Sequence, residues 1–291
     1  MAEHRGEKHG LKKTLVAAAV VIGSGTLLFQ GLTQAATKIE GNRSSTVPTS
    51  YASVAGDPPP AAQSGLPEGY RKANYSVGSI DLEYYLDQAP TSKDMNREEA
   101  AEIGARTLWE IFGLDLEDQA IEIGYQRATE SLPRSNWYAD VLIEGQRTYS
   151  FSVDSVTGEL FSIGWARTLD SPVSVAFDAA LQRNPQEYVD LAKRLAEKYN
   201  VVNGAVKAAE YNGQGYSGND PTISVNVTGE NGEVALMSFS RYDRALLGIV
   251  YDGMYKPSLE AHEKFRQRIL QENPAPPARG QDREIVLQVA E

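Results

Sequence analysis

The chain contains no cysteine among its 291 residues. This absence excludes disulfides, thiolate nucleophiles, zinc sites built with cysteine and lipid attachment through a cysteine. Secreted eukaryotic domains often depend on disulfides, whereas bacterial envelope proteins commonly do without them, so the absence fits a bacterial source.

Histidine is almost as scarce, and beyond the first 36 residues only His262 is present. One histidine cannot form a histidine-based metal cluster, and no Gly-x-Ser-x-Gly elbow accompanies it. Acidic residues gather at Asp115, Glu117 and Asp118, but their spacing does not follow the EF-hand loop. We therefore expect no catalytic residue, no cofactor and no metal ligand.

Positively charged residues are also fewer than acidic ones, 28 Lys and Arg against 39 Asp and Glu. The net charge is −11, and the first 36 residues carry four Lys or Arg against two Glu, so the remainder carries −13. An acidic body repels phosphate backbones, because binding to them depends on clustered Lys and Arg. We expect no nucleic-acid partner.

The longest uncharged stretch runs from Thr14 to Thr37, and residues 14–36 within it are the candidate membrane segment. A helix of this length can cross a hydrocarbon core of about 30 Å. Lys12 and Lys13 precede it, so the positive-inside rule places residues 1–13 in the cytoplasm and the body outside. Two interpretations stay open: an uncleaved signal-anchor in the cell membrane, or a signal peptide cleaved near Thr33-Gln34-Ala35 that releases a secreted body.

Residues 37–74 are rich in Ser, Pro, Ala and Gly, which predicts a flexible linker. The alternation of apolar residues from Ile80 to Leu86 then indicates a first strand or a docking segment. A helix is predicted from an Asn96 cap to Gly113. Gly104 lies on its apolar side and indicates a close contact between helix and sheet.

Strand signals follow this helix, and the same order of elements then recurs. The first set covers residues 120–126, 137–143, 147–153 and 160–165; a helix at 185–199 precedes the second set at 205–211, 222–227, 233–240 and 245–251. The match aligns Ser150-Phe151-Ser152 with Ser238-Phe239-Ser240 and makes the second turn shorter by two residues.

The recurrence predicts an α+β fold of two repeated units, each a helix packed on a four-stranded antiparallel sheet. The units are expected at residues 75–170 and 171–256, with a C-terminal helix and tail at 257–291. Ser258 is expected to cap that helix, and the apolar residues from Ile285 to Val289 are a late strand or a docking peptide.

The residues Phe151 to Leu160 read Phe-Ser-Val-Asp-Ser-Val-Thr-Gly-Glu-Leu. A helix followed by strands that close in this form resembles the PepSY domain family, with a cystatin/PepSY-like fold. Asp154, Gly158 and Glu159 form the structural turn of the motif, and turn chemistry alone explains them. The second unit lacks this turn.

The resemblance implies tandem PepSY-like units in membrane-anchored bacterial envelope proteins, some of them tied to spore germination. The family also occurs in propeptides of secreted metallopeptidases, for which an inhibiting or chaperoning role is suggested. No catalytic residue comes with the resemblance.

Gly213, Gly215 and Gly218 formally match the dinucleotide-binding pattern G-x-G-x-x-G. That site needs a helix after the last glycine, whereas Asn-Asp-Pro and an alternating strand follow here. The pattern predicts a hairpin.

These observations favour a non-enzymatic extracytoplasmic protein that binds or regulates an envelope partner, for example a peptidase. A sheet edge could hold the partner by strand addition. The alternatives are a cell-wall glycan hydrolase that uses paired carboxylates and a purely structural envelope component.

Overall fold

The computed structural model describes residues 66–129 and 132–272. The expected membrane segment at 14–36, most of the linker and the strand signal at 285–289 lie outside the described residues. Within the described ranges, no helix combines the length and the apolar character that a membrane span needs.

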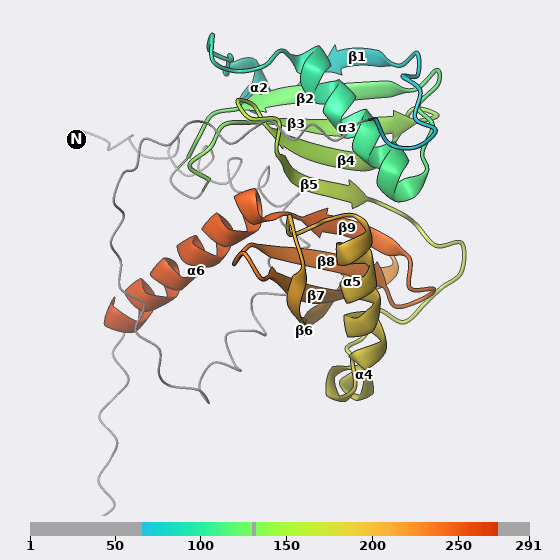
Figure 1. The fold of residues 1–291 in the computed structure, drawn as a ribbon, viewed down its shortest axis with the longest axis vertical. Coiled ribbons are helices and arrows are strands. Elements are labelled where there is room, and N and C mark those ends of the chain that lie inside the picture. The colour runs from blue at the N-terminus through green and yellow to red at the C-terminus, as the bar shows by residue number, and fades with distance from the viewer. Residues whose placement is uncertain (1–65, 130–131, 273–291) are drawn as a thin grey trace, which may run out of the picture.

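The strands form a nine-stranded sheet in the order β1-β2-β3-β4-β5-β9-β8-β7-β6 (Figure 1). All neighbours pair antiparallel except β1 and β2, which are parallel. The bounds are β1 Ser76–Ser79, β2 Ala120–Gln126, β3 Asn136–Ile143, β4 Gln146–Asp154, β5 Leu160–Trp165, β6 Val206–Ser217, β7 Asp220–Gly229, β8 Val234–Ser240 and β9 Leu246–Val250.

The predicted α+β class is confirmed, but the chain has a continuous sheet where two four-stranded sheets were expected. The cause is the antiparallel pairing of β5 with β9, in which Ile163 lies opposite Ile249 and Gly164 opposite Gly248. A side chain at Gly248 would not fit this pairing, because its Cβ would lie 2.9 Å from the carbonyl oxygen of Ile163. The alternation of apolar residues predicts which residues form strands, but it does not predict which strands of the two units pair with each other.

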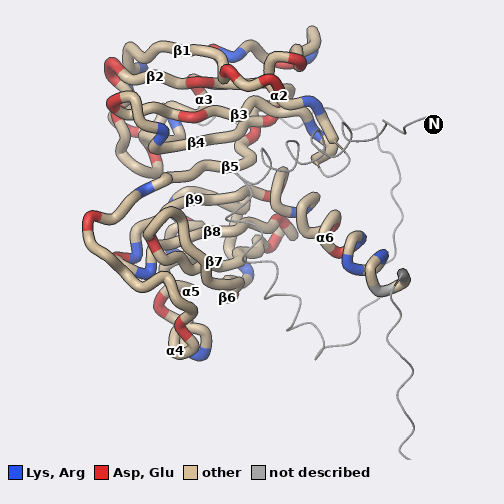
Figure 2. Tube along the Cα trace, turned by 180° about the vertical axis from the view of Figure 1, so that it is seen from behind, with Lys and Arg blue, Asp and Glu red and all other residues tan. Residues whose placement is uncertain are grey.

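The helices cover both faces of the sheet (Figures 1 and 2). Their bounds are α2 Glu83–Leu86, α3 Arg97–Phe112, α4 Ala179–Arg183, α5 Gln186–Lys198 and α6 Asp252–Glu272. α3 and α5 pack on one face, where apolar side chains such as Phe151, Ile163 and Ile249 form the main core. α2 and α6 lie on the opposite face, where Tyr255 of α6 donates to Asn226 at 2.6 Å.

α3 follows its sequence signals closely. Asn96 accepts from the backbone N–H of Glu99 and Glu99 reaches back, which completes a capping box, and Gly113 ends the helix at φ 64°. The close contact expected at Gly104 is present, because a Cβ there would lie 2.3 Å from the ring of Phe151.

Two expected elements differ. The stretch from Ile80 to Leu86, expected as a first strand or a docking segment, is not a strand, because β1 ends at Ser79 and residues 83–86 form α2. Tyr85 of α2 turns onto the sheet and fills the space above Gly124. Ser258 does not cap the last helix: α6 begins at Asp252, and the Ser258 hydroxyl donates to the backbone of the preceding turn. The burial of Tyr255 against the sheet accounts for the earlier start.

Candidate functional site

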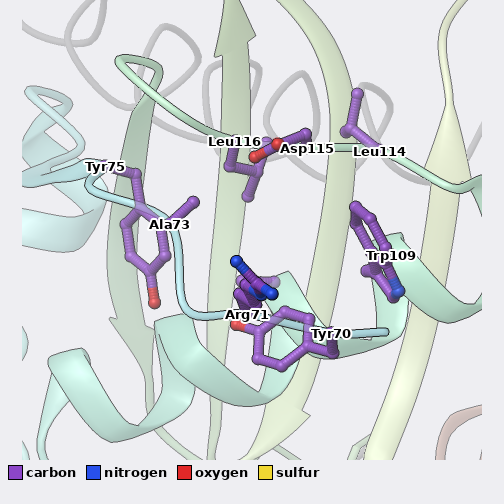
Figure 3. A pocket seen from close by; sticks show the side chains of 9 residues that line it. Tyr70, Arg71, Ala73, Tyr75, Trp109, Leu114, Asp115 and Leu116 are labelled. Carbon is purple, nitrogen blue, oxygen red and sulfur yellow. The ribbon is translucent and has the colours of Figure 1, made fainter. Parts of the chain in front are cut away.

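A small hollow opens where residues 66–75 cross the outer side of α3 (Figure 3). Its enclosed space is about 10 Å³, room for about one water molecule, and it reaches about 190 Å³ only when open solvent is counted. Leu116 and Ala105 are almost fully buried and form its apolar floor. The other lining residues are Tyr70, Arg71, Ala73, Tyr75, Trp109, Leu114 and Asp115.

The segment that forms one side of the hollow is fastened to α3 through Glu102. This carboxylate accepts hydrogen bonds from the hydroxyls of Tyr70 at 2.9 Å and Tyr75 at 2.7 Å. Burial, followed by the bond to Glu102, raises the pKa of both tyrosines. Lys72 and Arg106 each lie 3.6 Å from the same carboxylate. The chain is therefore packed from Tyr70 onward, before the expected end of the linker at residue 74.

The indole of Trp109 forms a wall of the hollow. Its N–H donates to the backbone oxygen of Glu68 at 3.3 Å, and its ring meets Tyr70 edge-on with centroids 6.4 Å apart. The indole is therefore fixed by α3, to which Trp109 belongs, and by contacts with Glu68 and Tyr70 of the preceding segment.

Two charges of opposite sign also line the hollow. Arg71 is exposed, and none of the described residues forms a hydrogen bond or ion pair with its guanidinium. Asp115 accepts the backbone N–H of Glu117 at 3.0 Å and has no ion-pair partner in the described part of the chain. The hollow therefore combines an apolar floor with one unpaired cation and one unpaired anion.

A second feature is a group of exposed apolar side chains at one end of the sheet, which we call the aromatic end surface. Its members are Val175, Phe177, Tyr216 and Tyr242, each 40–56% exposed. Tyr216 lies opposite Pro221 in the β6–β7 hairpin, and Pro221 accepts a backbone bond from the residue before Tyr242.

A polar network under the aromatic end surface holds the β5–α4 linker, residues 166–178, which joins the two halves of the sheet. Arg241 donates to Gln214 at 2.8 Å and to the backbone oxygen of Ala176 at 3.0 Å. Gln214 binds both the N–H and the C=O of Asp178. The surface is therefore supported by side-chain bonds to the linker backbone.

The linker is anchored at its other end by Arg167. This side chain donates to Asp220 at 2.7 Å and to both carboxylate oxygens of Asp243. The bond from Arg167 lowers the pKa of Asp243 to about 2. Asn219 binds the N–H and the C=O of Leu169, each at 2.7 Å.

The turn residues singled out by the sequence lie apart from both features, near the first turns of α3. Asp154 accepts two backbone N–H groups of its turn, and Gly158 adopts φ 75°. Arg134 bonds Asp154 and Glu159, each at 2.7 Å. Sequence reasoning missed Arg134, because nothing in the chain marks a loop arginine 20 positions earlier as its partner.

The sheet does bring two carboxylates together on its second face. Glu122 and Asp140 lie opposite each other on β2 and β3, and Arg147 binds both, at 2.9 and 3.3 Å. Burial raises the pKa of Asp140 against the opposing bond from Tyr138. A shared guanidinium occupies both groups, whereas glycoside hydrolysis needs one carboxyl group on each side of a bound sugar.

The other motifs singled out by the sequence have structural roles. Gly213 and Gly215 lie within β6, and Gly218 turns the hairpin at φ 59°. Glu117 accepts the backbone N–H of Asn74 at 2.8 Å. Among the residues described, no three His, Cys, Asp or Glu side chains gather closely enough to hold a metal.

Comparison with known proteins gives little. No family model and no curated protein matches the chain. Among solved structures, the Bacillus megaterium YpeB C-terminal domain aligns with 55% of this chain at 10% identity and a TM-score of 0.35. The alignment spans 65% of that domain, slightly less than two thirds of its length.

Proposed function

We propose that the chain is a non-enzymatic binding protein that holds a protein partner on the extracytoplasmic side of a cell membrane. The aromatic end surface is the observation that carries this proposal. Exposed apolar side chains that gather at one place on a folded domain are typical of interaction sites, and tyrosine is enriched in their most important contacts.

Strand addition is less well supported than side-chain docking. β1 offers only four residues at one edge, and β6 at the other edge has two register shifts. Lys207 and Glu210 are exposed on β6. Short strands, bulges and charged residues are the devices by which edge strands avoid pairing with other chains.

The proposed extracytoplasmic location is based on the N-terminal sequence. The uncharged residues 14–36 would tether the body or direct its export, and Lys12 and Lys13 orient the segment. The net charge of the body, −13, disfavours anionic surfaces as partners.

We also propose that the two halves of the sheet are copies of one PepSY-like unit. Strand pairs in the second half lie 86 positions after their counterparts: Asn136–Asp154 and Thr222–Ser240, Phe151–Ile163 and Met237–Ile249, Val153–Leu160 and Phe239–Leu246. The constant spacing makes the two turns equal in length, so the alignment of Phe151 with Phe239 was displaced by two residues.

Site-specific photo-cross-linking in the source cell tests the binding function. A benzoylphenylalanine is placed at Tyr216 or Tyr242, with Tyr84 on α2 as a matched exposed tyrosine and Lys207 as a probe of the β6 edge. The proposal requires one protein product of discrete mass at Tyr216 and Tyr242 and none at Tyr84. A product only at Lys207 would point to strand addition. No product at any position would contradict the binding function and favour a purely structural envelope component.

A further inference from the structure

We infer that Asn203 is a site of spontaneous deamidation, at which a neutral side-chain amide becomes a carboxylate without an enzyme. The backbone nitrogen of Gly204 attacks the side-chain carbonyl carbon of Asn203. A C–N bond forms there, the bond to Nδ2 breaks, and ammonia leaves with the proton of the Gly204 N–H. One water molecule then opens the five-membered imide at either of its carbonyl carbons, which leaves aspartate or isoaspartate at position 203. The reaction does not depend on the proposed protein partner.

The sequence offers three candidates for this reaction. Asn-Gly pairs occur at Asn203-Gly204, Asn212-Gly213 and Asn231-Gly232. Asparagine is a chemically labile residue, and a following glycine has no side chain to hinder the ring closure. The three pairs are equivalent by this criterion, and only their surroundings in the folded chain distinguish them.

The pair at Asn203 is open to the reaction. Both residues are exposed in the turn between α5 and β6. Among the described residues, none accepts a hydrogen bond from the N–H of Gly204, and a Cβ placed on Gly204 would meet no atom within 4 Å. The Asn203 amide donates to Glu233 at 3.0 Å in an exposed position, where water can replace this bond. The attacking nitrogen is therefore available, and the amide can turn toward it.

The pair at Asn231 is held in the turn between β7 and β8. The N–H of Gly232 donates to the backbone oxygen of Gly229 at 3.0 Å. The Asn231 side chain donates to the backbone oxygen of Val202 at 2.9 Å and accepts the N–H of Glu233 at 3.0 Å. Both the attacking nitrogen and the amide must give up hydrogen bonds before the ring can close.

The pair at Asn212 is held inside the sheet. Gly213 lies within β6, opposite Ser224 of β7. Asn212 is 6% exposed, and its amide donates to Asn226 at 3.0 Å and to the hydroxyl of Tyr255 at 3.3 Å. Deamidation here requires local opening of the β6–β7 pair.

The product at position 203 would change a contact between two turns. A carboxylate would replace the amide that donates to Glu233, so two negative charges would lie where a hydrogen bond now joins the turn after α5 to the turn before β8. Like charges at this separation repel each other. Deamidation would therefore loosen this contact and add one negative charge to an already acidic body.

The test measures conversion at the three pairs by mass spectrometry. The full-length chain is kept folded at mildly alkaline pH, and a parallel sample is unfolded in guanidinium chloride. Trypsin separates Asn203, in the peptide 199–207, from the other two pairs, in the peptide 208–241. Samples digested at the start of the incubation give the conversion that the digestion itself causes, and Asn203→Ser shows whether Asn200 contributes to the signal of its peptide.

We expect the three pairs to convert at comparable rates in the unfolded chain. In the folded chain Asn203 should convert at least about tenfold faster than Asn212 or Asn231. Tenfold corresponds to about 1.4 kcal/mol, which the hydrogen bonds given up at the other two pairs supply. Conversion of Asn212 or Asn231 as fast as Asn203 in the folded chain would overturn the proposal. Protection of Asn203 by about tenfold or more on folding would overturn it as well.

Discussion

Replacement of Gly104 by alanine is the sharpest test of the packing between α3 and the sheet. The added Cβ would lie 2.3–2.4 Å from three ring atoms of Phe151, which is fully buried. Relief requires a shift of about 1 Å in a close-packed core, which costs up to about 3 kcal/mol. Alanine favours helix over glycine by about 1 kcal/mol, so we expect a net loss of about 2 kcal/mol in the free energy of unfolding.

Urea denaturation followed by tryptophan fluorescence measures this loss, and the midpoint of thermal unfolding should fall by about 4–8 °C. Gly78→Ala is the matched control, because no atom lies within 4 Å of a Cβ placed there. Phe151→Leu should cost less in the Gly104→Ala background than in the parent chain, since it makes room for the new methyl group. If Gly104→Ala stabilised the chain as helix propensity alone predicts, the close contact would be wrong.

Three further predictions concern the polar contacts. Arg167→Met should lower the free energy of unfolding by about 3–5 kcal/mol, because it leaves the fully buried Asp220 charged and unpaired, and adding Asp220→Asn should restore part of the loss in the same urea titration. Burial raises the pKa of Asp140, so the ionised form destabilises the fold as pH rises through that pKa. Asp140→Asn should therefore be more stabilising, relative to the parent, at about pH 7 than at about pH 3, and an equal effect at both would refute this. Asn219→Ala removes two bonds to Leu169 and should speed limited proteolysis of the β5–α4 linker roughly 5- to 30-fold, with unchanged cleavage sites elsewhere as the control.

Local signals in the sequence predicted local structure well. The cap at Asn96, the helix end at Gly113 and the turn from Asp154 to Glu159 all depend on residues within a few positions of one another. The close approach at Gly104 was also readable, because glycine weakens a helix and, on its apolar side, leaves room for a close neighbour. The residues that determine such features are their immediate neighbours in the sequence.

Contacts between residues far apart in the sequence could not be predicted from the sequence. Tyr70 lies in a segment that composition assigned to a linker, and its anchor Glu102 is 32 positions away. The unpaired state of Arg71 likewise depends on where the folded chain leaves it. The hollow at Trp109 therefore had no signature in the sequence, and neither did the network around Arg241, which joins the linker to β6.

The pairing of β5 with β9 has a consequence for how the protein meets other molecules. Two separate four-stranded sheets would have four edges, whereas the continuous sheet formed by the described residues has two, at β1 and β6. One of these is four residues long, and the other is interrupted by bulges and by Lys207. Because both edge strands are short or bulged, a proposed partner would contact side chains of the sheet more readily than its backbone N–H and C=O groups. The exposed tyrosines at the end of the sheet, Tyr216 and Tyr242, are then the more favourable contacts for the proposed partner.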